Sequence, residues 1–190
     1  RRQRQMCIRD RVNASTFKGN YTSDPSGNGG AIATLDANTT INNSIFGGTG
    51  DGEGNTAKNG GAIYFDPTQL SGSGSLTING SDFINNHATN SAGAIYQAGG
   101  TLTVNGSLFD GNSAINNSNG GAISSFGSGK LIIDGSKFLN NTSYAAADNN
   151  SGDGGAIYTS AGYETVIKNS YFENNIAVES SLSNDGGAII

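Results

Sequence analysis

The segment LTVNGSLFDGNSAINNSNGGAI, residues 102–123, contains both motifs that decide the fold of this 190-residue chain. The first motif is Ser-x-Phe-x-x-Asn, which runs here from Ser107 to Asn112. The second is Gly-Gly-Ala-Ile, from Gly120 to Ile123. Both motifs recur about every thirty residues and alternate along the chain. A period of this length is typical of solenoids and other stacked repeats.

Aligning the repeats on phenylalanine produces columns of like residues. A serine always lies two positions before the phenylalanine, a β-branched residue lies five before it, and an asparagine follows three after it in every copy except that of Phe46. The phenylalanines are Phe17, Phe46, Phe83, Phe109, Phe138 and Phe172. The Gly-Gly-Ala-Ile copies begin at Gly29, Gly60, Gly120, Gly154 and Gly186, with a variant copy that begins at Ala92.

The residues between these columns predict short strands joined by tight corners. Leu76 to Ile78 and Leu102 to Val104 alternate apolar residues with threonine, as a half-buried strand does. Ser-x-Phe and Gly-Ala-Ile-Tyr supply two further strands per repeat, and dipeptides such as Asn105-Gly106 tolerate the positive φ of a sharp corner. We therefore predict an all-β parallel solenoid of about six rungs with three strands each. Stacked phenylalanines and an internal asparagine ladder would hold the rungs together.

Residues 1–11 differ from everything that follows. They contain every arginine of the chain together with its only cysteine and only methionine. We interpret residues 1–11 as translated sequencing adaptor, with a disordered basic arm as the alternative, and residues 12–190 as a solenoid fragment truncated at both ends. Val12 already occupies the β-branched column, which agrees with a boundary there.

The composition of residues 12–190 restricts the function. Five lysines face fourteen acidic residues, a net charge of −9, whereas nucleic-acid binding needs a basic surface. We therefore expect no nucleic-acid partner. Without a cysteine, this part also lacks disulfides, thiol nucleophiles and cysteine-based zinc sites.

The alternation of Gly-Gly-Ala-Ile with Phe-x-x-Asn over residues 12–190 resembles the passenger repeats of chlamydial polymorphic outer membrane proteins. The resemblance implies a right-handed parallel β-helix that is exported, displayed at the cell surface by an autotransporter route, and used in adhesion. It also implies a partner on a host or neighbouring cell, either a protein or a glycan. Membrane contact would come only through an anchor domain outside these residues.

The alternative is a fragment of a carbohydrate-active β-helix enzyme, either a polysaccharide lyase or a glycosidase. After residue 11 there is no arginine to neutralise a uronate, and the acidic residues Asp82, Asp110, Asp134 and Glu173 do not gather in one column. His87, the single histidine, is expected at an exposed turn. We therefore predict no catalytic residues, no enzyme activity and no organic cofactor.

Two further features concern binding. Asp51, Glu53 and Asn55 alternate with glycines and could bind calcium, and Asp148 to Asp153 form a second acidic insertion. The segments 49–59, 113–119, 142–153 and 176–185, which lie between the two motifs, vary in length and composition. We expect these insertions to project at one corner and to form the recognition edge, because solenoids carry binding surfaces on their loops.

Overall fold

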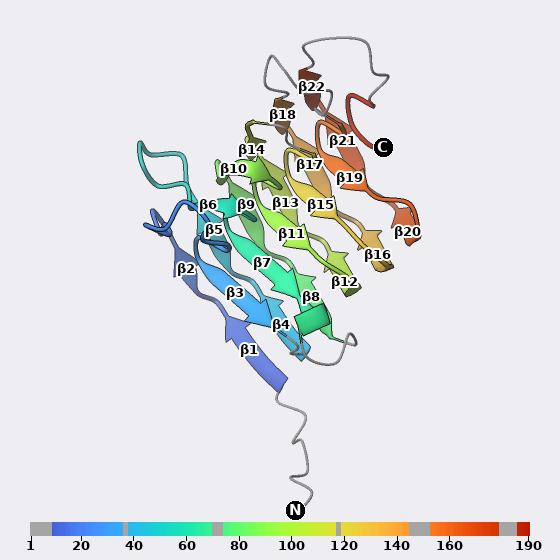
Figure 1. Ribbon diagram of the computed structural model, residues 1–190, viewed down its shortest axis with the longest axis horizontal. Coiled ribbons are helices and arrows are strands. Elements are labelled where there is room, and N and C mark those ends of the chain that lie inside the picture. The colour runs from blue at the N-terminus through green and yellow to red at the C-terminus, as the bar shows by residue number, and fades with distance from the viewer. Residues whose placement is uncertain (1–8, 36–37, 70–73, 117–118, 145–152, 179–185) are drawn as a thin grey trace, which may run out of the picture.

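The structure is a computed structural model, and it describes residues 9–35, 38–69, 74–116, 119–144, 153–178 and 186–190. The described chain is a parallel β-solenoid of about five turns, which confirms the predicted fold class. Its strands form four parallel sheets, and each full turn contributes one strand to every sheet. Figure 1 shows the turns stacked in chain order, from β1 at one end of the stack to β22 at the other.

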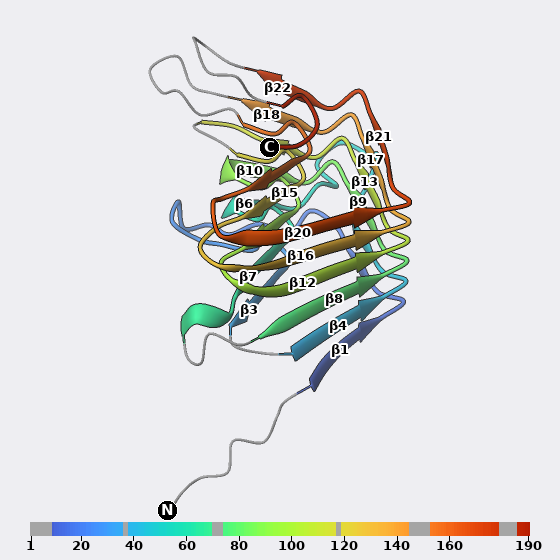
Figure 2. The same ribbon diagram turned by 90° about the vertical axis from the view of Figure 1, so that its right-hand side faces the viewer.

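The first two sheets have six strands each. The strands of the first sheet are β1 (Arg9–Asn13), β4 (Asn38–Asn42), β8 (Ser75–Asn79), β12 (Gly100–Asn105), β16 (Gly129–Asp134) and β20 (Tyr163–Lys168). The strands of the second sheet are β2 (Thr16–Phe17), β5 (Ile45–Gly47), β9 (Asp82–Ile84), β13 (Leu108–Asp110), β17 (Lys137–Leu139) and β21 (Tyr171–Glu173). Figure 2 shows the first sheet from its outer side, with β1 to β20 in order.

The other two sheets have five strands each. The strands of the third sheet are β6 (Thr56–Asn59), β10 (His87–Ser91), β14 (Ser113–Ala114), β18 (Thr142–Tyr144) and β22 (Ile176–Val178). The strands of the fourth sheet are β3 (Ile32–Leu35), β7 (Ile63–Asp66), β11 (Ile95–Gln97), β15 (Ile123–Ser125) and β19 (Ile157–Thr159). A single 3-10 turn, η1 (Pro67–Gln69), follows β7 in the described chain.

The third sheet corrects the prediction of three strands per turn. The Gly-Ala-Ile-Tyr strand belongs to the fourth sheet, and a further short strand precedes it. These extra strands bury only small residues, such as Ala57, Ala88, Ser91 and Ala114, so they have no apolar periodicity. Backbone hydrogen bonds between neighbouring turns hold them in place instead.

The solenoid begins before the predicted boundary at residue 12. In β1, Arg9, Asp10 and Arg11 pair in register with Asn38, Thr39 and Thr40 of β4. Residues 1–8 of the segment that we interpreted as adaptor or basic arm lie outside the described residues.

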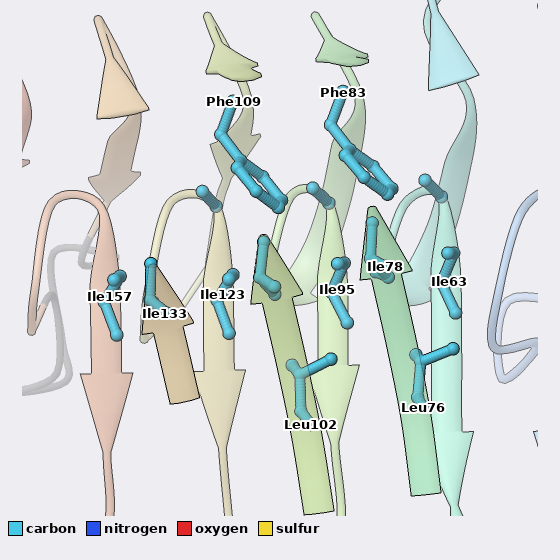
Figure 3. Packing of buried hydrophobic residues seen from close by; sticks show 14 of the residues in the cluster. Ile63, Leu76, Ile78, Phe83, Ile95, Leu102, Phe109, Ile123, Ile133 and Ile157 are labelled. Carbon is cyan, nitrogen blue, oxygen red and sulfur yellow. The ribbon is translucent and has the colours of Figure 1, made fainter. Parts of the chain in front are cut away.

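The interior consists of columns in which each residue stacks on its copy in the next turn. The six phenylalanine rings stack at centroid distances of 4.7–4.8 Å and are parallel within 5°. Isoleucines of the fourth sheet face leucines and isoleucines of the first sheet across the interior, as Figure 3 shows for Ile95 and Leu102. Each turn buries little alone, so the stability of the fold comes from contacts between neighbouring turns.

The two glycines of each Gly-Gly-Ala-Ile copy have different roles. Gly120 has a φ of +65°, and Ala92, its counterpart in the variant copy, has a φ of +60°. Gly121 does not need a positive φ, but a Cβ atom there would overlap the carbonyl oxygen of Gly155 and lie 2.5 Å from the backbone nitrogen of Thr142. The second glycine therefore allows the backbone at the start of the fourth sheet to pack directly against the backbone of the third sheet.

Candidate interaction surfaces

The internal asparagine ladder has six members, including one that the sequence spacing hid. Asn20, Asn86, Asn112, Asn141 and Asn175 follow phenylalanine by three residues, but Asn55 follows Phe46 by nine. Residues 48–54 form an insertion, after which Asn55 enters the same column. Its Nδ2 donates to Oδ1 of Asn86 at 2.8 Å, and its Oδ1 accepts from Nδ2 of Asn20 at 2.8 Å.

This position bears directly on the predicted calcium ligands. Asn55 is fully buried, and its Nδ2 also donates to the carbonyl oxygen of Phe17, so its amide group is engaged inside the solenoid. Glu53 lies outside and forms an ion pair with Lys18, with 3.0 Å between Oε2 and Nζ. Asp51 is exposed at the tip of the same loop. The structure thus separates Asn55 from Asp51 and Glu53, an arrangement that does not favour one calcium ion held by all three residues, and only a binding measurement tests that predicted site.

Acidic groups do not gather elsewhere in the part of the chain that the structure describes. Among those residues, no three histidine, cysteine, aspartate or glutamate side chains are placed to hold a metal ion. Of the second predicted acidic insertion, residues 148–152 lie outside the described ranges.

The acidic residues considered for an enzyme lie in three columns, and the two that share a column, Asp110 and Glu173, are separated by Leu139. Asp82 pairs in register with Ile45 and Leu108, and Asp110 pairs with Ile84 and Leu139. Asp134 pairs with Asn105 and Lys168, and Glu173 pairs with Leu139. In none of these registers do two carboxylates face each other, so the arrangement does not supply the paired acids of a glycosidase.

His87 is not at an exposed turn, which corrects the expectation from the sequence. It is the first residue of β10, half-buried on the outer side of the third sheet, and its Nδ1 lies 2.9 Å from Oγ of Ser113 in the next turn. Burial lowers the pKa of His87. His87 and Ser113 are register partners in adjacent turns, so the imidazole and the hydroxyl belong to one outer polar column of the third sheet.

The third sheet divides the predicted recognition edge into two parts, one that precedes its strands and one that follows them. Residues 48–54 form a loop that precedes β6 and projects from the body of the solenoid in Figure 1. The other variable segments begin with the third-sheet strands β14, β18 and β22 and continue beyond them. Residues 117–118, 145–152 and 179–185 of these segments lie outside the described residues. Tyr144 in β18 and Ile176 in β22 are 43% and 52% exposed.

A row of aromatic rings, which was not predicted from the sequence, follows the outer side of the fourth sheet. Tyr64 stacks on Tyr96 with a centroid distance of 5.2 Å, Tyr96 on Phe126 at 5.4 Å, and Phe126 lies 5.0 Å from Tyr158. Ser124 is the register partner of both Tyr96 and Tyr158. The ring beside those two tyrosines belongs to Phe126, two residues after Ser124. The sequence signal for this row is an aromatic residue at an outward position, as Tyr64 has between Ile63 and Phe65.

The tyrosines of this row are held in their protonated form. Burial raises the pKa of Tyr64 to about 12, and the nearby carboxylate of Asp66 acts in the same direction. Burial would also raise the pKa of Asp66, but hydrogen bonds from Thr68, Gln69 and Tyr64 together hold it below its usual value. The carboxylate anchors η1, because it accepts from the backbone nitrogen and Oγ1 of Thr68. These groups are structural donors and acceptors rather than a nucleophile and a base.

A groove lies at the corner where the fourth sheet turns into the first. It has a volume of about 450 Å³ and crosses the beginnings of four first-sheet strands. Its lining residues are Asn38, Gly74, Ser75, Gly100, Thr101, Ser128, Gly129 and Lys130. Its residues come from the corners of four turns and share no motif, so the sequence pattern does not predict the groove.

The comparison with protein families agrees with the repeated columns of phenylalanine, serine and asparagine. The family model described as the Chlamydia polymorphic membrane protein repeat matches residues 14–35, 53–66, 80–98, 135–160 and 169–189, just over half of the chain. Neither the curated proteins nor the solved structures contain a significant match. The repeats indicate a surface or outer membrane protein. Within the described ranges, no helix has the length and hydropathy needed to span a membrane.

Proposed function

Because the chain belongs to the Chlamydia polymorphic membrane protein repeat family, we propose that it is an adhesin-like passenger segment displayed on the outer face of the cell. Its partner would be a protein or a glycan on a host or neighbouring cell. In this proposal the solenoid is a rigid scaffold, its variable corners carry recognition, and attachment to the membrane comes from a separate anchor domain.

One observation carries the proposal: the interior is nearly constant from turn to turn, whereas the loops at the corners differ. In every turn the same phenylalanine, serine and asparagine columns satisfy their own packing and hydrogen bonding. The corner before the ladder asparagine is the single Gly111 in one turn and the seven residues 48–54 in another. Loops on a rigid scaffold are where proteins carry binding residues.

The test is adherence of beads coated with the purified 190-residue chain to cultured epithelial cells and to bacterial cells. Residues 48–54 are replaced by one glycine, which copies the corner at Gly111 and leaves the ladder intact. We expect wild-type beads to adhere to one of the cell types and the shortened variant to adhere less by about fivefold or more. Its circular dichroism and unfolding midpoint should match the wild type.

A second variant carries seven glycine and serine residues in place of residues 48–54. It keeps the loop length and removes the side chains of Asp51 and Glu53. Reduced adherence of this variant supports recognition by the loop. Full adherence of both variants would show that the recognition edge lies elsewhere, and wild-type beads that adhere to neither cell type would refute the adhesin role of the chain.

A further inference from the structure

Glycines border the groove at the start of the first sheet. Gly100 and Gly129 are register partners in adjacent turns. A Cβ atom at Gly129 would overlap the carbonyl oxygen of Gly100, and one at Gly100 would lie 2.7 Å from Cγ of Pro67. Only glycine therefore fits at these two positions, and there the groove is lined by backbone atoms.

Tyr163 closes the glycine column at its C-terminal end. It pairs in register with Gly129, and its hydroxyl oxygen accepts from the backbone nitrogen of Gly99 at 2.8 Å. The same hydroxyl donates to the carbonyl oxygen of Phe126 at 3.2 Å. These bonds span three turns, so the backbone around the groove is held in a fixed position.

Each of four successive turns contributes one outward side chain to the wall of the groove. Asn38, Ser75, Thr101 and Lys130 are register partners in adjacent strands. Strands in a sheet lie about 4.8 Å apart, so these groups repeat at that interval along the axis. Oγ of Ser75 donates to Oδ1 of Asn38 at 2.8 Å, which fixes both side chains.

The described lining residues are polar, and Lys130 is the only charged one among them. Its Nζ forms an ion pair with Glu164, with 2.6 Å between Nζ and Oε1. Hydroxyl, amide and backbone groups are the partners that sugar hydroxyls require, whereas phosphate or sulfate groups require unpaired cations. We propose that this groove binds an uncharged linear glycan that lies along the solenoid axis.

A peptide strand fits the groove less well. Strand addition needs a free sheet edge, and β4, β8, β12 and β16 are each paired on both sides. A linear glycan needs no backbone edge, and its repeating hydroxyl groups can bond with one side chain of each turn. The inference goes beyond the proposed function, because it assigns a partner class to a surface that is separate from the loop of residues 48–54.

The test measures binding of cellohexaose and N-acetylchitohexaose to the 190-residue chain by titration calorimetry and saturation-transfer NMR. Hexagalacturonate serves as the charged comparison. We expect a Kd below about 1 mM for at least one neutral hexasaccharide and no binding of hexagalacturonate. Thr101→Trp, which fills the groove, should weaken binding by more than about tenfold. Thr101→Val, which removes one hydroxyl, should weaken it about fivefold.

The matched controls are Thr103→Trp and Thr103→Val. Thr103 is an outward residue of the same strand, two positions from Thr101, and it does not line the groove. These variants should bind within about twofold of the wild type. Equal losses at both positions, failure of the wild type to bind either neutral hexasaccharide, or binding of hexagalacturonate alone would overturn the proposal.

Bead adherence distinguishes this result from the proposed function. If the coated beads adhere to cells but neither neutral hexasaccharide binds, the groove proposal fails and the adhesin role stands. If a neutral hexasaccharide binds in the groove but the beads do not adhere, the groove proposal stands and the adhesin role fails.

Discussion

Asn112 donates to Asn141 twice, because its backbone nitrogen and its Nδ2 both bond to the same Oδ1, at 3.1 and 3.0 Å. The second proton of the Asn112 amide bonds to the carbonyl oxygen of Phe83 in the preceding turn. The four inner members of the ladder, Asn55, Asn86, Asn112 and Asn141, each connect three turns in this way, and their amide groups are fully hydrogen-bonded. The column thus joins the second and third sheets along the axis.

Removal of one internal ladder amide should be costly. Asn112→Ala leaves the buried donors of Asn86 and the carbonyl oxygen of Phe83 without partners, and we expect a loss of about 3 kcal/mol in the free energy of unfolding. Asn105→Ala is the control, because Asn105 belongs to an outer ladder, where it donates to Asn79 and water can replace the bond. Urea titration should give a loss below about 1 kcal/mol for the control. Equal losses would contradict the role assigned to burial.

Two glycines should respond to substitution for different reasons. Gly106 has a φ of +55° and open space around its Cβ position, so Gly106→Ala should cost about 1 kcal/mol, and Gly106→Asn less. Asparagine already holds this corner at Asn43 and Asn169. Gly121→Ala should cost more than about 3 kcal/mol, because a Cβ atom there overlaps backbone. Thermal and urea unfolding of the three variants checks the order.

Stability should fall as the pH falls from about 7.5 to about 5, and His87 should be the cause. Burial lowers the pKa of His87 from its ordinary value of 6.5. Between the folded and the unfolded pKa, the unfolded chain therefore binds more protons, so stability present above the unfolded pKa is lost as the pH falls through the folded one. Urea titrations across this range should show the slope in the wild type and a flatter profile in His87→Gln. The same slope in both proteins would assign the effect to other groups.

The unfolding midpoint should not change when calcium is added or removed. Asn55 is engaged in the internal ladder, and Glu53 already pairs with Lys18, so the loop lacks the cage of oxygen ligands that calcium prefers. Thermal unfolding in millimolar calcium chloride and in chelator tests this expectation. A higher midpoint in calcium, lost in Asp51→Asn, would instead establish a site at the loop tip.

The sequence predicted the columns whose spacing is constant within one turn. The distances from serine to phenylalanine and from phenylalanine to asparagine do not change where no insertion falls between them, so these side chains were assigned correctly. Asn55 was missed because residues 48–54 separate it from Phe46. The third sheet was missed because its strands bury only small residues. A repeated Asn-x-Ala, as in Asn86 to Ala88 and Asn112 to Ala114, was the signal that could have identified it.

The binding surfaces were harder to predict, because they depend on neighbours from different turns. In the aromatic row, Phe126 is not the register partner of the tyrosines, because Ser124 pairs with Tyr96 and Tyr158. The sequence spacing alone therefore does not place Phe126 in the row. The groove combines residues from the corners of four turns, including Gly100 and Gly129. These residues share no motif, so the sequence does not predict that they form one surface.

The direction of the internal ladders has a consequence for how such a protein can evolve. In every described turn that has a following turn, the backbone amides of the ladder serine and asparagine donate to the side-chain oxygens of that following turn, as Ser81 does to Ser107 and Asn86 to Asn112. Every turn therefore offers the same acceptors on one side and the same donors on the other. Duplication or deletion of one whole repeat in the gene would leave no unmatched bond at the new junction. Such a protein can change its length by recombination while its outer residues diverge independently.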